Sequence, residues 1–109
     1  MVVRRLVDTS PDVLAAVMLD AAGAPIASSD PDDDRSRELA DLARQLVERA
    51  DGASSDPVEQ IEVQATGGSA FAVRTTAHIL ACVTRRAALP ALVLYDLRHA
   101  LAEWEAEAT

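Results

Sequence analysis

The feature that most constrains the fold is a pair of short segments that are apolar on both faces. Residues 13–20 read Val-Leu-Ala-Ala-Val-Met-Leu-Asp, and residues 79–84 read Ile-Leu-Ala-Cys-Val-Thr. Unbroken apolar runs of this length are typical of strands that are buried on both sides. Helices must therefore cover both faces of the sheet that contains them.

The first of these strands is predicted to form a hairpin with the segment that follows it. Asp20-Ala21-Ala22-Gly23 indicates a turn, because glycine adopts a positive φ without steric cost. Residues 25–28 then predict a short strand. Pro25 cannot donate a hydrogen bond to a neighbouring strand, so we expect this segment at an edge of the sheet.

The second strand closes a predicted three-stranded meander. Residues 58–65 predict its first strand, in which residues 60–65 alternate with Ile61, Val63 and Ala65 on one face. Thr66-Gly67-Gly68 predicts the hairpin turn that follows. Residues 69–76 predict the middle strand. The chain lacks a strand-helix-strand alternation, so we expect a mostly antiparallel sheet.

Three helices complete the prediction. Val2, Val3, Leu6 and Val7 indicate a short helix over residues 2–8, and Pro90 begins a final helix on which Trp104 belongs to the apolar stripe. The longest helix is predicted over residues 30–51, with Asp30 as its cap, Pro31 at its first position and Gly52 after its end. Its apolar positions are Leu39, Leu42, Ala43, Leu46, Val47 and Ala50.

The opposite face of the long helix is charged. Arg37 with Asp41, and Arg44 with Glu48, have the spacing of ion pairs one turn apart. Residues 53–57 read as a loop. The whole pattern fits one domain over residues 1–109, in the α/β (α+β) class.

Composition excludes several classes of function. The net charge of −8 disfavours binding to nucleic acids or to anionic membranes. Lysine is absent, so Schiff-base chemistry and Walker-type phosphate binding lose their essential side chain. The single Cys82 forms no internal disulfide, and neither a membrane span nor a signal peptide is evident, which together predict a cytoplasmic protein.

We find no catalytic, metal-binding or cofactor-binding pattern. Asp30, Asp32 and Asp34 resemble the start of a calcium loop, but the required glycine and final glutamate are missing, so a helix start explains them better. Gly67-Gly68 is explained by a hairpin turn, and the lone histidines, His78 and His99, fit surface or capping roles.

One arginine pair admits two interpretations. Arg85-Arg86 could supply an arginine to the active site of a GTPase in trans, although solvated loop arginines are the commoner case. We therefore expect a protein that is not an enzyme and that carries no cofactor.

The strand at residues 58–65 has no predicted neighbour on its outer side. An unpaired edge invites a second strand, so we expect a homodimer through this strand and the helix at 31–51. Glu59 and Glu62 favour the alternative, a monomer whose edge repels a second copy. The candidate dimer residues are Val58, Glu59, Ile61, Val63, Leu42 and Leu46.

The chain resembles the roadblock/LC7 family over nearly its whole length. The segments that carry the resemblance are VLAAVMLDAAGAPIASS (13–29), RSRELADLARQLVERA (35–50), IEVQATGGSAFAVRTTAHILACVT (61–84) and PALVLYDLRHALAEW (90–104). The resemblance implies a profilin-like sandwich, in which a five-stranded antiparallel sheet has the long helix on one face and the terminal helices on the other. It also implies a longer first helix than residues 2–8 allow.

The resemblance further implies a non-catalytic homodimer that scaffolds or regulates a small Ras-like GTPase. The implied partner contacts lie on the outer positions of the long helix, here Arg37, Asp41, Arg44, Gln45 and Glu48. The alternative is a profilin-like or PAS-like domain that senses a small ligand, for which small side chains over residues 13–20 would leave room.

Overall fold

The computed structural model describes residues 2–55 and 58–107, which form eight elements in the predicted order. Positions 56 and 57 of the predicted loop lie outside the described residues. The elements are α1 (Val2–Thr9), β1 (Val13–Asp20), β2 (Pro25–Ser28), α2 (Asp33–Gly52), β3 (Gln60–Ala65), β4 (Gly68–Arg74), β5 (His78–Thr84) and α3 (Pro90–Glu107).

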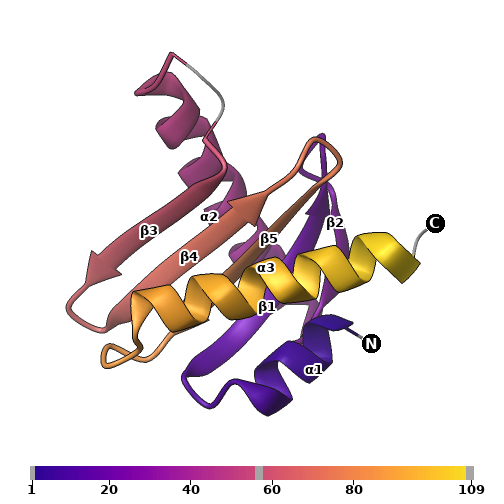
Figure 1. Ribbon diagram of the computed structural model, residues 1–109, viewed down its shortest axis with the longest axis vertical. Helices are drawn as coiled ribbons and strands as arrows, with labels where there is room; N and C mark the ends of the chain where they lie inside the picture. Colours follow the sequence, from indigo (N-terminus) through magenta and orange to yellow (C-terminus); the bar gives the residue numbers. More distant parts are fainter. Residues whose placement is uncertain (1, 56–57, 108–109) are drawn as a thin grey trace.

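The five strands form one sheet in the order β2-β1-β5-β4-β3, and every neighbouring pair is antiparallel. The prediction of an antiparallel sheet is confirmed. The two segments that are apolar on both faces became β1 and β5, which both lie inside the sheet. Pro25 begins β2 at one edge, and β3 forms the other edge (Figure 1).

Helices cover the sheet on both sides, as the doubly apolar strands require. In Figure 1, α3 crosses the front of the sheet with α1 beside it, and α2 lies behind. The front core includes Met18, Phe71, Leu80 and Leu97. A second, smaller core lies under α2 and includes Val17, Leu19, Ile79, Ala81, Ala72, Ala40, Ala43 and Val47.

The start of α2 differs from the prediction. Asp32 is the cap, and its carboxylate accepts hydrogen bonds from the backbone N–H groups of Asp34 at 2.9 Å and Arg35 at 3.2 Å. Asp30 instead accepts a bond from the N–H of Asp32, which makes a turn before the helix. The predicted start at Asp30 and Pro31 was wrong because three aspartates compete for the capping position.

The ion pairs along α2 also differ from the prediction. Arg37 lies 3.7 Å from Asp34, and Arg44 pairs with Asp41, so each arginine meets the acid three positions before it. Side chains on a helix lean toward its N-terminus, which brings an arginine to an acid on the preceding turn. The predicted pairs with the acids four positions later were wrong for this reason.

Candidate functional site

The apolar stripe of α2 divides into two parts. Ala40, Ala43 and Val47 are buried against the sheet, whereas Leu42 is 38% exposed and Leu46 is only half-buried. The small alanines bring the helix close to the strands. The leucines lie beside this contact line and remain available to another surface.

Strand pairing places two apolar rows on the α2 side of the sheet. The covered row joins Val17, Ala81, Ala72 and Ile61 across β1, β5, β4 and β3, and it packs against α2. The open row lies two residues along each strand, so its side chains share the same face. It joins Ala15, Val83, Ala70 and Val63.

The open row is incompletely covered. Val63 is 42% exposed, and the other three members are only half-buried. We refer to the open row and the two accessible leucines of α2, Leu42 and Leu46, as the α2–β3 surface. Exposed apolar surface that continues to a free strand edge is typical of a protein contact.

The backbone of β3 presents unpaired groups at this edge. The N–H of Arg74 donates to the carbonyl of Glu59 at 2.8 Å, so position 59 bonds toward β4. Because bonded and non-bonded positions alternate in an antiparallel ladder, Ile61, Val63 and Ala65 also bond toward β4. The N–H and C=O groups of Gln60, Glu62 and Gln64 therefore point outward.

An ion pair fixes the approach to β3. The Arg74 guanidinium donates to both carboxylate oxygens of Asp51, at 2.6 and 2.8 Å, and the N–H of Val58 donates to the same carboxylate at 3.1 Å. The Arg74 hydrogen bonds lower the pKa of Asp51 to about 2, with a further contribution from Val58. This group of contacts, which we call the Asp51–Arg74 bracket, connects the end of α2 to β4 and to the residues that lead into β3.

The candidate dimer residues lie on two elements, α2 and the segment that contains β3. Ile61 and Val63 project on the α2 side of β3, Leu42 and Leu46 lie on α2, and the exposed Glu59 and half-buried Val58 precede the strand, which begins at Gln60 and not at residue 58. The prediction that this strand lies at an edge is confirmed. Whether these residues form a dimer contact stays a prediction.

The candidate partner residues all lie on α2. Arg37, Asp41, Gln45 and Glu48 are exposed. Arg44 is half-buried, and its guanidinium donates to the carbonyl of Gly23 at 2.7 Å besides pairing with Asp41. It therefore helps to hold the β1–β2 hairpin against α2, while the other four side chains face solvent.

Sequence reasoning missed Ala15, Ala70 and Val83, which complete the open row. No signal in the sequence marks them, because they become neighbours only through the order of the strands. The bracket between Asp51 and Arg74 was also missed, since these residues lie 23 positions apart.

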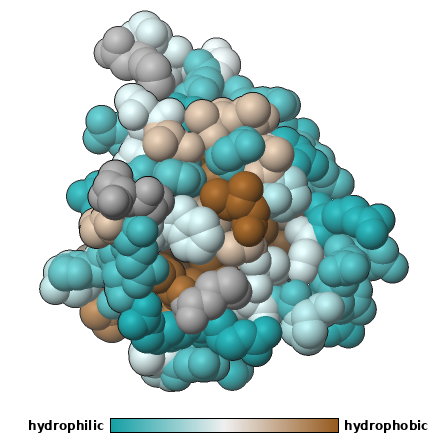
Figure 2. Space-filling model, turned by 90° about the vertical axis from the view of Figure 1, so that its right-hand side faces the viewer, coloured by the Kyte–Doolittle hydropathy of each residue, from teal (hydrophilic) through white to brown (hydrophobic). Residues whose placement is uncertain are grey.

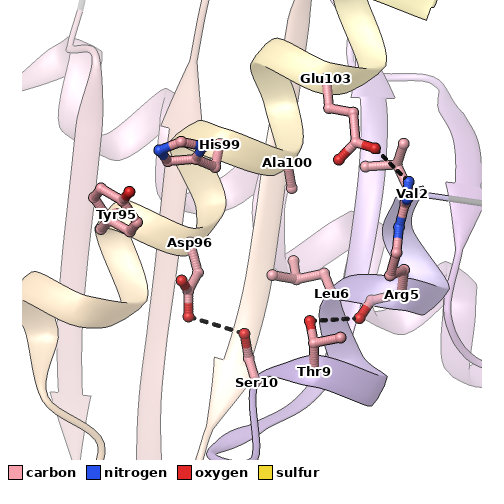
Figure 3. Close-up of a pocket in the computed structure, with 10 residues that line it drawn as sticks. All are labelled: Val2, Arg5, Leu6, Thr9, Ser10, Tyr95, Asp96, His99, Ala100 and Glu103. Carbon is pink, nitrogen blue, oxygen red and sulfur yellow. Dashed lines mark hydrogen bonds and ion pairs between the residues drawn. The ribbon is translucent and has the colours of Figure 1, made fainter.

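A hollow of about 220 Å³ lies between α1 and α3 on the opposite face (Figure 3). Four of its polar side chains are paired: the Ser10 hydroxyl donates to Asp96 at 2.9 Å, and Arg5 lies 2.6 Å from Glu103. The rings of Tyr95 and His99 stand 4.3 Å apart at its margin. A pocket that binds a small ligand is usually larger and offers polar groups that are free to bind it. This hollow therefore gives little support to the ligand-sensor alternative.

The other histidine, His78, is held by two side chains of α3. The ring of His78 is bonded to Glu105 at 2.7 Å through Nδ1, and the indole N–H of Trp104 donates to its Nε2 at 3.4 Å. The bond from His78 lowers the pKa of Glu105. These contacts attach the end of α3 to the start of β5, so His78 has a packing role in addition to the surface or capping role predicted for it.

The remaining candidate residues are one buried cysteine and two exposed arginines. Cys82 is buried in β5, and burial raises the pKa of its thiol to about 12. Arg85 and Arg86 are both exposed, and Arg85 donates to the carbonyl of Pro11 at 3.4 Å. Within residues 2–55 and 58–107, no three His, Cys, Asp or Glu side chains are grouped to hold a metal ion, and no helix is long and apolar enough to cross a membrane.

Figure 2 shows the side of the molecule at the β2 edge, where hydrophilic surface surrounds a small hydrophobic patch. Ile26 in β2 is 44% exposed. This edge strand is only four residues long and begins with a proline, two features that limit pairing with another chain. The longer β3 edge is therefore the better candidate for strand pairing.

Comparisons with known proteins agree with this fold. The model of the Roadblock/LC7 domain family matches residues 2–85. A Roadblock/LC7 domain from Streptomyces avermitilis superposes with a TM-score of 0.84 at 22% identity, over 98% of this chain and 94% of that one. A search of the curated proteins finds no sequence that matches the chain.

Two further structures share the fold. MglB from Myxococcus xanthus superposes with a TM-score of 0.70 at 15% identity, over 94% of this chain and 88% of that one. A profilin from Schizosaccharomyces pombe superposes with a TM-score of 0.61 at 16% identity, over 97% of this chain and 94% of that one. The predicted profilin-like sandwich is confirmed.

Proposed function

Because the chain belongs to the Roadblock/LC7 domain family, we propose that it is a non-catalytic homodimeric module that binds and regulates a small Ras-like GTPase. The observation that carries this proposal is the α2–β3 surface, whose partly exposed apolar residues include Val63 on β3, a strand with an unpaired edge. The protein dimerises through this surface, and the exposed side chains of α2 receive the GTPase.

The edge and the apolar face support self-association together. Pairing of β3 with β3 of a second copy satisfies the outward backbone groups of both chains and extends the sheet. A two-fold axis perpendicular to the sheet places both α2 helices on the same side. Leu42, Leu46 and Val63 of each copy then lose solvent contact beside the axis, which adds an apolar contribution to the ladder.

The resemblance described above supports the GTPase assignment, and the surface of α2 is consistent with it. Arg37, Asp41, Gln45 and Glu48 are exposed and carry charges of both signs. Paired helices would present two copies of this surface on one side of the dimer. MglB structures, one of them described with a tetrameric arrangement, provide a precedent for assembly among proteins of this fold.

Solution mass tests the dimer. Light scattering over a concentration series is expected to give twice the mass of one chain. Val63→Asp, which adds a charge to the α2–β3 surface, is expected to shift the protein to monomer. The matched control is Leu92→Asp, because Leu92 is 55% exposed on α3, on the opposite face, and its substitution leaves the mass unchanged.

A monomer at every concentration would overturn the dimer. Equal loss of mass in both variants would show that general charge repulsion, and not the α2–β3 surface, controls association.

Affinity capture tests the partner. The probes are Ras-like GTPases loaded with GDP or with a non-hydrolysable GTP analogue, and binding is expected in one nucleotide state. Glu48→Arg on α2 is expected to weaken capture, whereas the matched reversal Asp8→Arg on α1, where Asp8 is also exposed, preserves it. Failure of every GTPase to bind in either state would contradict this part of the proposal.

A further inference from the structure

The hydrogen-bond pattern of β3 restricts how two copies can pair. Only Gln60, Glu62 and Gln64 direct their backbone N–H and C=O groups outward, because positions 59, 61, 63 and 65 bond toward β4. A second β3 must place its own outward positions opposite these three. Registers that set an outward position against an inward one form no bonds and are excluded.

Among the symmetric registers, those that pair at least two of the three outward positions have the two-fold axis at Ile61, Glu62 or Val63, whereas an axis at Gln60 or Gln64 pairs only one. With the axis at Glu62, Gln60 meets Gln64 of the second copy, Glu62 meets its own copy, and Gln64 meets Gln60. All three outward positions then pair, and each pair exchanges two hydrogen bonds. An axis at Ile61 or Val63 pairs only two of the three within Gln60–Ala65.

We propose that the dimer two-fold axis passes through Glu62, so that the Glu62 carboxylates of the two copies face each other across it and limit the strength of the dimer. This inference rests on the proposed function, since it assumes that β3 pairs with itself. It assigns to Glu62 a role in tuning association, while the ladder and the apolar contacts drive it.

The side chains on the two faces of the pair are consistent with this register. On the α2 side, Ile61 lies opposite Val63 of the second copy, so two apolar residues meet. On the α3 side, Glu62 projects with Gln60 and Gln64, because alternate residues share a face. The Gln64 amide donates to the Glu62 carboxylate at 2.9 Å.

The charged groups near Glu62 offset only part of the repulsion. Arg98 on α3 donates to the Gln60 side chain, one position along this face. In the dimer, an Arg98 therefore flanks the glutamate pair at each end but stands beyond the glutamines. Phe71 is the residue of β4 opposite Glu62 and contributes no charge.

Like charges directly opposite each other weaken a strand pair modestly, by an amount that salt reduces. The additional pair of ladder bonds in this register outweighs such a contact at an exposed edge. Neutralising Glu62 should therefore tighten the dimer without changing its geometry.

Disulfide trapping tests the register. Paired bonded positions stand about 5.5 Å apart between Cα atoms, within the range that a disulfide spans. Glu62→Cys is therefore expected to cross-link under mild oxidation, whereas Ile61→Cys and Val63→Cys do not. The wild-type chain is the background control, because its only cysteine, Cys82, is buried.

The trapping result separates the register from the dimer. In a register shifted by one position, the axis falls on a neighbour, and the two copies of residue 62 move roughly 7 Å apart along the strands. Cross-linking of Ile61→Cys or Val63→Cys in place of Glu62→Cys would overturn the register while the dimer stands. A wild-type dimer with no cross-link in any variant would also overturn it, and a monomeric wild type would overturn the proposed function itself.

Dimer affinity tests the role of Glu62. Sedimentation at low salt is expected to show that Glu62→Gln lowers the dimer Kd about two- to five-fold. Glu107→Gln is the matched control, because it removes the same charge at an exposed position at the end of α3, away from β3 (Figure 1). Equal effects of the two variants, or no tightening by Glu62→Gln, would overturn the assignment.

Discussion

Truncation of Leu80 to alanine tests the arrangement of the core most directly. Leu80 lies in β5, the middle strand of the sheet, and its side chain is fully buried beneath α1 and α3. Met18 of β1 and Val73 of β4 flank it as strand partners. Leu89 provides the matched control, since it precedes α3 and is 66% exposed.

The expected cost follows from burial. Truncation of a leucine to alanine removes three carbons, which corresponds to about 2.4 kcal/mol of transfer free energy. The cavity adds to this cost because β5 is held by strands on both edges and cannot close the gap, so we expect about 3 to 4 kcal/mol in total. Leu89→Ala is expected to cost about 0.5 kcal/mol or less.

Urea unfolding followed by circular dichroism measures both values, at one protein concentration so that self-association contributes equally. A domain of this size has a total stability of about 5 to 15 kcal/mol, so Leu80→Ala should lower the unfolding midpoint substantially. Similar losses in the two variants would refute the placement of Leu80 in the core.

Three further predictions concern the hairpin, the bracket and the cysteine. Gly23→Ala is expected to lower stability by roughly 1 to 2 kcal/mol, because Gly23 has a φ of +89° and an added Cβ would lie 2.8 Å from a side-chain carbon of α2. The control Gly52→Ala adds a Cβ that meets open space and should leave stability unchanged. Equal melting temperatures of the two variants would contradict this prediction. The pKa of Asp51 is about 2 in the folded chain against 3.8 ordinarily, so the stability that its carboxylate contributes is present above pH 4 and lost as the pH falls toward 2. Unfolding measured over this acid range should show a smaller loss of stability in Asp51→Asn than in the wild type. Identical curves would argue against the ion pair with Arg74. Cys82 should react with a thiol reagent only when urea unfolds the chain, since burial raises its pKa to about 12; rapid labelling of the folded protein would contradict its burial.

Local patterns in the sequence determined the elements and much of their arrangement. The apolar runs at 13–20 and 79–84 could be buried only inside a sheet that is covered on both faces, and they became β1 and β5. Pro25 removed a ladder donor and marked β2 as an edge. These inferences succeeded because hydrophobic periodicity and backbone donors act within a few residues.

Other features depended on competition among similar local choices. Three aspartates near the start of α2 can each cap a helix, and only the path of the chain after β2 selected Asp32. Arginines on α2 could reach acids on either side, and the approach of the β1–β2 hairpin directed Arg44 toward Gly23.

The candidate site was decided by the tertiary structure. The sequence alone indicated that residues 58–65 form a strand with an unpaired outer edge and that the helix before them carries an apolar stripe. Strand order joined Ala15, Val83, Ala70 and Val63 into the open row, and the small alanines of α2 determined which row the helix covers. The register between β3 and β4 directed the backbone groups of Glu62 outward, because hydrogen-bond direction alternates along a ladder and is fixed only when the partner strand is in place.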